Sequence, residues 1–189
     1  MQMDEYQPLA MRTSTEGHDR VRNGCLGLIG ESGEIIDAIK KWEFQSGDNA
    51  TFPIDKIVDE CGDVLWYCAE LATGLGTDME ELYDKLSEGF YNDLHPMNAE
   101  AEHVDIVCAR LCFACGKPFN VLFEPTFDAP KEWREAQAKA QIVGIMITVQ
   151  DILESCMSTL DEAMERNIAK LRKRYPDGFD PERSLHRAE

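Results

Sequence analysis

Apolar residues recur at helical spacing along nearly the whole chain, and no segment shows the alternation of a half-buried strand. In the segment 27–42, for example, Ile35, Ile36 and Ile39 share one arc of a helix. A chain with this pattern buries its core between packed helices, so we expect an all-α fold, a helical bundle. The expected helices cover about 16–42, 53–75, 77–89, 100–115 and 131–175, and the last is divided near residues 158–159.

Turn-forming residues mark the connections between these helices. A polar loop at 43–52 precedes Pro53, which suits the first position of a helix. The segment 91–98 is expected to be a connector, and the proline-bearing segment 117–133 an irregular link. At 189 residues the chain is long enough for one domain, or one and a half, and we expect a single domain over 1–189.

Acids and glycines lie beside the apolar arc of the first helix. Glu31 and Glu34 are about 60° apart on one flank of that helix, so they border the core. Four glycines in the same segment each cost a helix roughly 0.5–1 kcal/mol relative to alanine. We expect that cost to be offset by the close approach of a neighbouring helix. The four glycines are Gly24, Gly27, Gly30 and Gly33.

The second helix carries a polar stripe of Lys56, Glu60, Asp63 and Tyr67 beside an apolar one. Antiparallel packing of the first two helices through their apolar faces would bring two acid pairs to one seam. Four carboxylates together need cations to stay ionised, and hard oxygen ligands suit Mg²⁺ or Mn²⁺. These acids are Glu31, Glu34, Glu60 and Asp63. The alternative is a solvated helix face, because the same spacing recurs elsewhere in this acidic chain.

The end of the last helix concentrates basic residues. Asn167, Lys170 and Arg174 share one face, and amide, ammonium and guanidinium groups together suit a polyphosphate. The alternative is complementation of the helix dipole, since bases are favoured in any last turn.

Charge and cysteine usage limit the classes of function. The net charge of −17 argues against nucleic acid or an anionic membrane as the main partner, but a metal ion could bridge a small anionic substrate to carboxylates. The polar N-terminus is not a signal peptide, and no apolar run is expected to span a bilayer. Seven cysteines, mostly in apolar surroundings, fit reduced thiols in a cytoplasmic protein.

Two capping boxes suggest an internal repeat: T-D-M-E at 77–80 and T-L-D-E at 159–162. Displacing the chain so that Gly62 falls on Gly144 also aligns the two boxes. Two amphipathic helices with matched caps can also align by chance, so duplication and coincidence both stay open.

If the repeat is real, its second copy has lost the acids. Glu60 then falls on Ile142 and Asp63 on Ile145. One half would carry the chemistry, and the segment at about 92–156 would be a degenerate repeat or a helical insertion serving as scaffold.

Other constellations are weaker. Cys108, Cys112 and Cys115 have the spacing of some iron–sulfur enzymes, but it is also the spacing of a buried helical stripe, and we favour core packing. Glu100 and His103 form an E-x-x-H without the second copy that a di-iron bundle needs. The glycine-rich segment lacks the G-K-[ST] of a phosphate loop. The histidines are expected at the surface: His18, His95, His103 and His186.

Three patterns, in order, resemble those of the MazG-like all-α nucleotide pyrophosphohydrolases. They are G-L-I-G-E-S-G-E-I-I-D, D-E-C-G-D-V-L-W-Y and N-I-A-K-L-R-K-R-Y-P-D-G-F, and the opening Y-Q-P-L-A-M-R-T is also similar. The resemblance covers about 5–90 and 157–180. It implies Mg²⁺ held by Glu31, Glu34, Glu60 and Asp63, and hydrolysis of nucleoside triphosphates to monophosphate and pyrophosphate.

The same resemblance implies roles for the basic end of the chain. Lys170, Arg174 and Tyr175, with Asn167, would bind the phosphates or the sugar, and Lys56 is a further candidate from the polar stripe. An activated water would attack phosphorus in line, with Glu31 or Glu34 as general base.

The chain departs from the family in one respect. Family members usually pass from the second acid pair through one cap into N-x-x-K-L, whereas here a long segment separates two caps. We therefore expect either a homodimer or a monomer with an internal pseudo-two-fold axis. The substrate is open: dUTP, dCTP or modified nucleotides, or phosphoribosyl-ATP as in a neighbouring enzyme class. A non-catalytic helical module that kept the fold is the alternative from another class.

Overall fold

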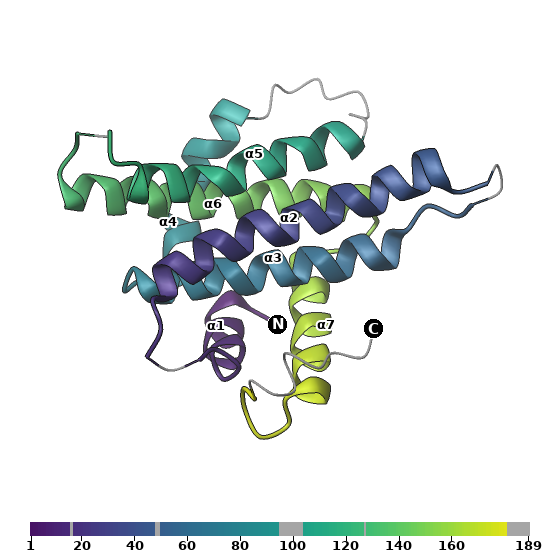
Figure 1. Ribbon diagram of the computed structural model, residues 1–189, viewed down its shortest axis with the longest axis horizontal. Helices are drawn as coiled ribbons and strands as arrows, with labels where there is room; N and C mark the ends of the chain where they lie inside the picture. Colours follow the sequence, from purple (N-terminus) through teal and green to yellow (C-terminus); the bar gives the residue numbers. More distant parts are fainter. Residues whose placement is uncertain (16, 48–49, 95–103, 127, 181–189) are drawn as a thin grey trace.

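The computed structural model describes residues 1–15, 17–47, 50–94, 104–126 and 128–180, and only the backbone of 90–94. This part of the chain is all helical and contains no strand, so the expected all-α fold is confirmed (Figure 1). The helices are α1 (Met3–Met11), α2 (Arg20–Gln45), α3 (Ile54–Gly74), α4 (Met79–Leu94), α5 (Val104–Phe123), α6 (Lys131–Ser155) and α7 (Leu160–Arg174).

Two helix pairs form the body of the molecule. α2 lies beside α3, α5 lies beside α6, and the pairs meet through α2 and α5 and through α3 and α6 (Figure 1). α7 and α1 pack against α3 on the side away from α5 and α6. Fully buried side chains between the pairs include Leu28, Ile35, Leu65, Ile142 and Ile145. The α2–α3 pair thus has one side in the core and another facing α1 and α7.

The packing of the second half resembles that of the first. α2 and α3 are followed by α4, which packs on α6, while α5 and α6 are followed by α7, which packs on α3. At the positions that the proposed repeat aligns with Glu60 and Asp63, Ile142 and Ile145 are fully buried. The duplication itself stays a prediction, and no helix within the described ranges corresponds to α1 in this pattern.

Side-chain caps explain where several helices begin. The Asp19 carboxylate accepts from the backbone N–H of Arg22 at 3.0 Å and starts α2. Thr159 caps α7 as expected by accepting from the N–H of Glu162 at 3.2 Å. The expected Thr77 cap is wrong for α4, because Asp78 takes that role.

Asp78 caps α4 with a single oxygen. Its Oδ1 accepts from the backbone N–H groups of Glu80 at 2.9 Å and Glu81 at 3.1 Å. An aspartate next to a threonine offers a charged acceptor, which is the stronger partner for the two N–H groups. The helix therefore begins one residue later than the box predicts.

One helix was not expected, and several boundaries differ from the expected ones. α2 covers Arg20–Gln45 instead of about 16–42, so it includes part of the loop expected at 43–52. α1 was not expected, and it depends on burying Tyr6 and Ala10 against the rest of the fold. α4 continues through 91–94, where a connector was expected. α5 runs through Pro118 to Phe123 instead of ending near Cys115, because the segment after the proline keeps an apolar face packed on the core.

α5 is the one helix among the described residues that is long and apolar enough by itself to cross a membrane, whereas no such run was expected from the sequence. Taken together as one segment, α6 and α7 also pass that test, but the chain bends by 96° between them. The exposed side of α5 carries Asp105, Arg110 and Lys117. Charges are costly in hydrocarbon, so this pattern is typical of a bundle helix.

Candidate active site

Close packing of α2 on α3 brings their acids to one seam. A Cβ at Gly24 would lie 2.8 Å from Leu71 Cβ, and one at Gly27 would lie 2.1 Å from the Tyr67 ring. Only glycine allows this approach at these two positions. For the other two glycines the expectation is wrong, because a Cβ at Gly30 or Gly33 would meet nothing within 4 Å.

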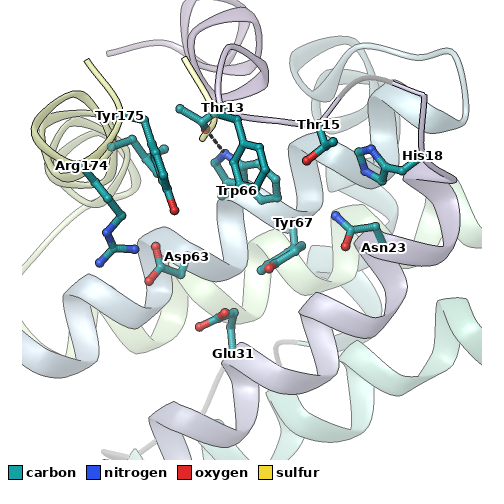
Figure 2. A pocket seen from close by; sticks show the side chains of 12 residues that line it. Thr13, Thr15, His18, Asn23, Glu31, Asp63, Trp66, Tyr67, Arg174 and Tyr175 are labelled. Carbon is teal, nitrogen blue, oxygen red and sulfur yellow. Dashed lines mark hydrogen bonds between the residues drawn. The ribbon is translucent and has the colours of Figure 1, made fainter. Parts of the chain in front are cut away.

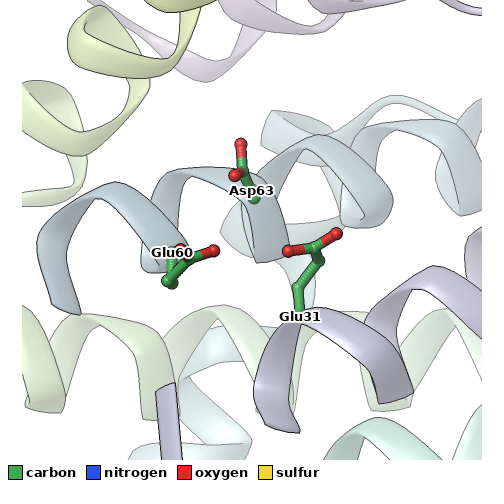
Figure 3. Close-up of side chains that lie close together, drawn as sticks. All are labelled: Glu31, Glu60 and Asp63. Carbon is green, nitrogen blue, oxygen red and sulfur yellow. The ribbon is translucent and has the colours of Figure 1, made fainter. Parts of the chain in front are cut away.

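Glu31, Glu60 and Asp63 form an acidic trio, shown in Figure 3. Each offers one carboxylate oxygen, and the three oxygens all lie within 4.8 Å of one another. Glu60 is buried, and the other two are half-buried. Oxygens at this density could hold a metal ion, and the donor set consists of hard carboxylates.

Burial and mutual repulsion perturb two members of the trio. Burial, with the charges of Asp63 and Glu60, raises the pKa of Glu31 from 4.5 to about 7. Burial also raises the pKa of Asp63, although the neighbouring Lys170 opposes the effect. A carboxyl with a pKa near 7 holds a proton for part of the time at neutral pH, so a cation at the trio would favour its ionised form.

Glu34 lies outside this trio. It is exposed, one turn along α2 from Glu31, and it lines a separate hollow of about 310 Å³ together with Lys41 and Lys56. The Lys56 ammonium is paired with the Glu60 carboxylate, and this hydrogen bond raises the pKa of Lys56. The structure therefore brings three of the four expected acids together and leaves the fourth on the solvent side.

α7 holds Asp63 through both carboxylate oxygens. Asn167 Nδ2 donates to Oδ1 at 2.7 Å, and Lys170 Nζ donates to Oδ2 at 2.5 Å. Gly62 permits this contact, because a Cβ there would lie 2.9 Å from the carbonyl oxygen of Ala163. Two residues that were expected to bind substrate thus contact a residue of the acidic trio.

An open pocket of about 410 Å³ begins at the trio, as Figure 2 shows. Arg174 and Tyr175 of the α7 end lie at one side, with the guanidinium turned toward Asp63. The Tyr175 side chain is 4% exposed, and its hydroxyl has no hydrogen-bond partner among the described residues. The lining residues are Thr13, Thr15, His18, Asn23, Glu31, Asp63, Trp66, Tyr67, Leu171, Arg174, Tyr175 and Phe179.

Some lining residues were not expected to contribute to the site. Trp66 Nε1 donates to the Ala10 carbonyl and to Thr13 Oγ1, both at 3.0 Å, which fixes the indole at the pocket wall. Nothing in the local sequence indicates this contact, because it depends on α1.

His18 is only partly exposed, where a surface residue was expected, and the other three histidines lie outside the described residues. His18 is half-buried, and its Nε2 lies 2.5 Å from Oε1 of the fully buried Glu70. One signal for this pair was present. Glu70 continues the stripe of Glu60, Asp63 and Tyr67 by one more turn of α3.

The seven cysteines are free thiols, and all except Cys112 are buried. Cys108 and Cys115 pack in the core, as expected for a helical stripe. Cys112 is half-buried, and its Sγ donates to the Ser32 carbonyl at 3.3 Å. This accords with the reduced thiols expected from the sequence. The expected E-x-x-H pair, Glu100 and His103, lies outside the described residues.

Residues 22–91 match the family model described as the MazG nucleotide pyrophosphohydrolase domain. The chain carries a MazG domain. The matched segment includes most of α2, all of α3 and most of α4, and with them all four expected acids. A search of curated proteins and a search of solved structures found no match.

MazG domains belong to enzymes that hydrolyse nucleotide anhydride bonds, so the chain is a nucleotide pyrophosphohydrolase. This identification argues against the alternative of a non-catalytic helical module. The α7 residues that contact the acidic trio lie outside the matched segment. Their contribution to the MazG site of this chain rests on the contacts described above.

Proposed function

We propose that this MazG-domain protein hydrolyses nucleoside triphosphates, either deoxynucleotides or modified nucleotides, to nucleoside monophosphate and pyrophosphate with Mg²⁺. One observation carries the proposal: an acidic trio of oxygens within 4.8 Å opens onto a pocket lined by Arg174, and Lys170 pairs with Asp63 of the trio. Acids alone would repel a triphosphate. The combination of acids for a cation and bases for phosphate favours this substrate class.

Glu31, Glu60 and Asp63 would hold the metal, with Glu34 turning in from the solvent side of α2. When bound, Mg²⁺ supplies charge neutralisation for the phosphates and acidity for water, and Mn²⁺ could replace it. The raised pKa of Glu31 supports this fit, because it reflects burial and repulsion by Asp63 and Glu60 that are not offset by positive charge. A cation at the trio would offset them and keep all three carboxylates ionised.

Cationic and amide groups of α7 would bind the phosphates. Asn167 and Lys170 donate hydrogen bonds to Asp63 of the trio, and Figure 2 shows the Arg174 guanidinium turned toward the same carboxylate. The Tyr175 hydroxyl, buried and without a partner among the described residues, supplies a hydrogen bond for the sugar or a phosphate oxygen. Lys56 would reach the phosphates from the other end of α3.

Glu31 is suited to take the proton of the attacking water. Its carboxylate belongs to the acidic trio and lines the pocket, so it would lie near a water that the metal activates. The water oxygen forms a bond to phosphorus as the bridging anhydride bond breaks. Attack at the α-phosphorus expels pyrophosphate with the electron pair, and attack at the β-phosphorus expels the nucleoside monophosphate. Glu34 is the second candidate for this role.

The test is pyrophosphate release from canonical and modified nucleotides and phosphoribosyl-ATP, with Mg²⁺ and with EDTA. We compare the wild type with Glu31→Gln, Glu34→Gln and the control Glu81→Gln, an exposed partner of Lys85 on α4. The proposal is supported if release requires metal and if Glu31→Gln and Glu34→Gln each reduce it about 100-fold or more, whereas Glu81→Gln does not. No release from any nucleotide by folded protein contradicts it. Release from phosphoribosyl-ATP alone supports the neighbouring enzyme class.

The assembly and its location are also proposals. The second half of the chain packs on the first with the pairing described above, so one chain would supply what two identical subunits supply in a homodimer. Light scattering decides between them: a mass near 21.4 kDa supports the internal pseudo-two-fold arrangement, and twice that mass supports a homodimer. The buried free thiols support a cytoplasmic location.

A further inference from the structure

The buried carboxylate of Glu70 contacts two residues that line the pocket at the end remote from the acidic trio, His18 and Asn23. Glu70 of α3 is fully buried, and none of the roles proposed above uses it. Its Oε2 accepts from Arg20 at 3.0 Å, and its Oε1 lies 2.5 Å from His18 Nε2 and 3.4 Å from Asn23 Nδ2. Arg20 also donates to Ser14 Oγ at 2.9 Å. A buried charge is held in place when it is paired and hydrogen-bonded in this way.

The carboxylate determines the orientation of the Asn23 amide. An ionised carboxylate only accepts hydrogen bonds, so the amide must turn its NH₂ group toward Glu70. The Asn23 carbonyl oxygen is then the group left for the pocket. Figure 2 shows Asn23 reaching from α2 toward Tyr67, and His18 and Thr15 lie beside it. His18 is held in the same way, through its Nε2, and its Nδ1 has no partner among the described residues.

The distance along α2 suits a nucleoside between the trio and this amide. Asn23 and Glu31 are separated by two turns, which corresponds to about 12 Å along the helix. Trp66 and Tyr67 line the pocket between them, with ring centroids 4.8 Å apart and planes at 83°. Aromatic walls of this kind stack with nucleobases. With phosphates at the trio, the edge of the base reaches Asn23.

We propose that Glu70 is a positioning residue that holds Asn23 as a hydrogen-bond acceptor, so that the pocket selects bases carrying an exocyclic amino group. Cytosine and adenine would donate their amino hydrogens to the Asn23 carbonyl oxygen. Uracil and hypoxanthine carry a carbonyl oxygen in place of the amino group. That oxygen would face the Asn23 carbonyl oxygen, and neither would have a hydrogen-bond donor. The inference rests on the proposed function, because that function puts the phosphates at the trio.

The test compares nucleotides that differ only in this amino group. Dissociation constants are measured with Mg²⁺ for α,β-methylene analogues of dCTP and dUTP, and of dATP and dITP, which the enzyme cannot cleave. Tripolyphosphate, which has no base, serves as the internal control. Variants are Glu70→Gln, whose amide can both donate and accept, and Asn23→Leu, which leaves the Arg20–Glu70 pair in place. Glu81→Gln is the matched control.

We expect the wild type to bind each amino nucleotide about 10-fold more tightly than its oxo counterpart. Glu70→Gln and Asn23→Leu should bring both ratios close to one and leave tripolyphosphate binding within about 2-fold of wild type. The inference is overturned if the wild type shows no preference for the amino nucleotides or prefers the oxo nucleotides. It is also overturned if Glu70→Gln and Asn23→Leu keep the wild-type ratio, or if they weaken tripolyphosphate binding as much as nucleotide binding. The proposed function fails separately, through absence of pyrophosphate release, since these binding measurements do not require hydrolysis.

Discussion

Lys170 Nζ lies 2.5 Å from Asp63 Oδ2, so a lysine of α7 is paired with a carboxylate of the acidic trio. The side chains are 27% and 24% exposed, which leaves the pair within reach of solvent. The lysine opposes the rise in the pKa of Asp63 that burial causes. Lys170 therefore already supplies part of the positive charge that the trio requires.

This pairing predicts opposite effects of Lys170→Met on the metal and on phosphate. Removing a positive charge beside the trio should strengthen Mg²⁺ binding several-fold, because the ion no longer competes with the lysine. The same change should weaken tripolyphosphate binding about 10-fold, because a phosphate partner is lost. Titration calorimetry of each ligand measures both effects.

The matched control is Lys173→Met, which removes an exposed lysine from the same helix. It should change both affinities by less than about 2-fold, because exposed charges are screened by solvent and salt. If Lys170→Met weakens Mg²⁺ binding, the lysine organises the trio instead of competing for it.

Two glycines on α2 predict substitutions of opposite sign. Gly27→Ala should lower the free energy of unfolding by about 1–3 kcal/mol, since its Cβ would overlap the Tyr67 ring. Gly30→Ala should raise it by about 0.5–1 kcal/mol, because the position is exposed and helical and a Cβ meets nothing within 4 Å. Urea unfolding measures both.

Tyr67 lines the pocket, so Gly27→Ala should also raise the KM for the nucleotide, whereas Gly30→Ala should not. Equal stability of the two variants would mean that the Tyr67 ring turns aside without cost.

The elements that carry their own periodicity could be predicted from the sequence. The amphipathic pattern indicated α2, α3 and α7 to within a few residues, and the E-x-x-E and E-x-x-D spacing put the acids on the flank of the core. This succeeded because a helix places residues three and four apart on one face, whatever surrounds it. The spacing could not tell Glu31, which faces Asp63, from Glu34, which faces solvent.

The rest depends on contacts between segments distant in sequence. α1 is short and contains Pro8, and it is held by the burial of Tyr6 and by bonds from Gln7 to α3 and its following turn. The Glu70 cluster joins side chains from α2, α3 and the segment before α2; the polar stripe of α3 indicates Glu70, but no local pattern reveals its partners. Both features need the fold before they can be recognised.

The cysteines predict slow modification in the native protein. Burial raises the pKa values of Cys25, Cys108 and Cys115 to about 12, so their thiolate fraction at pH 8 is about 1,000-fold below that of an ordinary thiol. Cys112 alone among the seven is not fully buried. Ellman's reagent should therefore titrate at most one thiol rapidly in native protein and all seven in guanidinium. Rapid reaction of two or more would contradict the burial of the other six thiols.

The raised pKa of Glu31 predicts how the stability of the metal-free protein depends on pH. In the folded protein its pKa is about 7, against an ordinary value of 4.5, so between these pH values the folded state binds more protons than the unfolded state. The free energy of unfolding therefore falls as pH rises through that window, and the loss is complete above about 7.

Glu31→Gln removes this titration. In EDTA, the variant should match the wild type near pH 5 and melt about 2–4 °C higher at pH 8 if the difference is about 1 kcal/mol. Added Mg²⁺ should reverse the order at pH 8, since only the wild type gains a full carboxylate set. Thermal melts at several pH values measure this, and a Tm difference that stays constant with pH would show that the pKa of Glu31 is not raised in the folded protein.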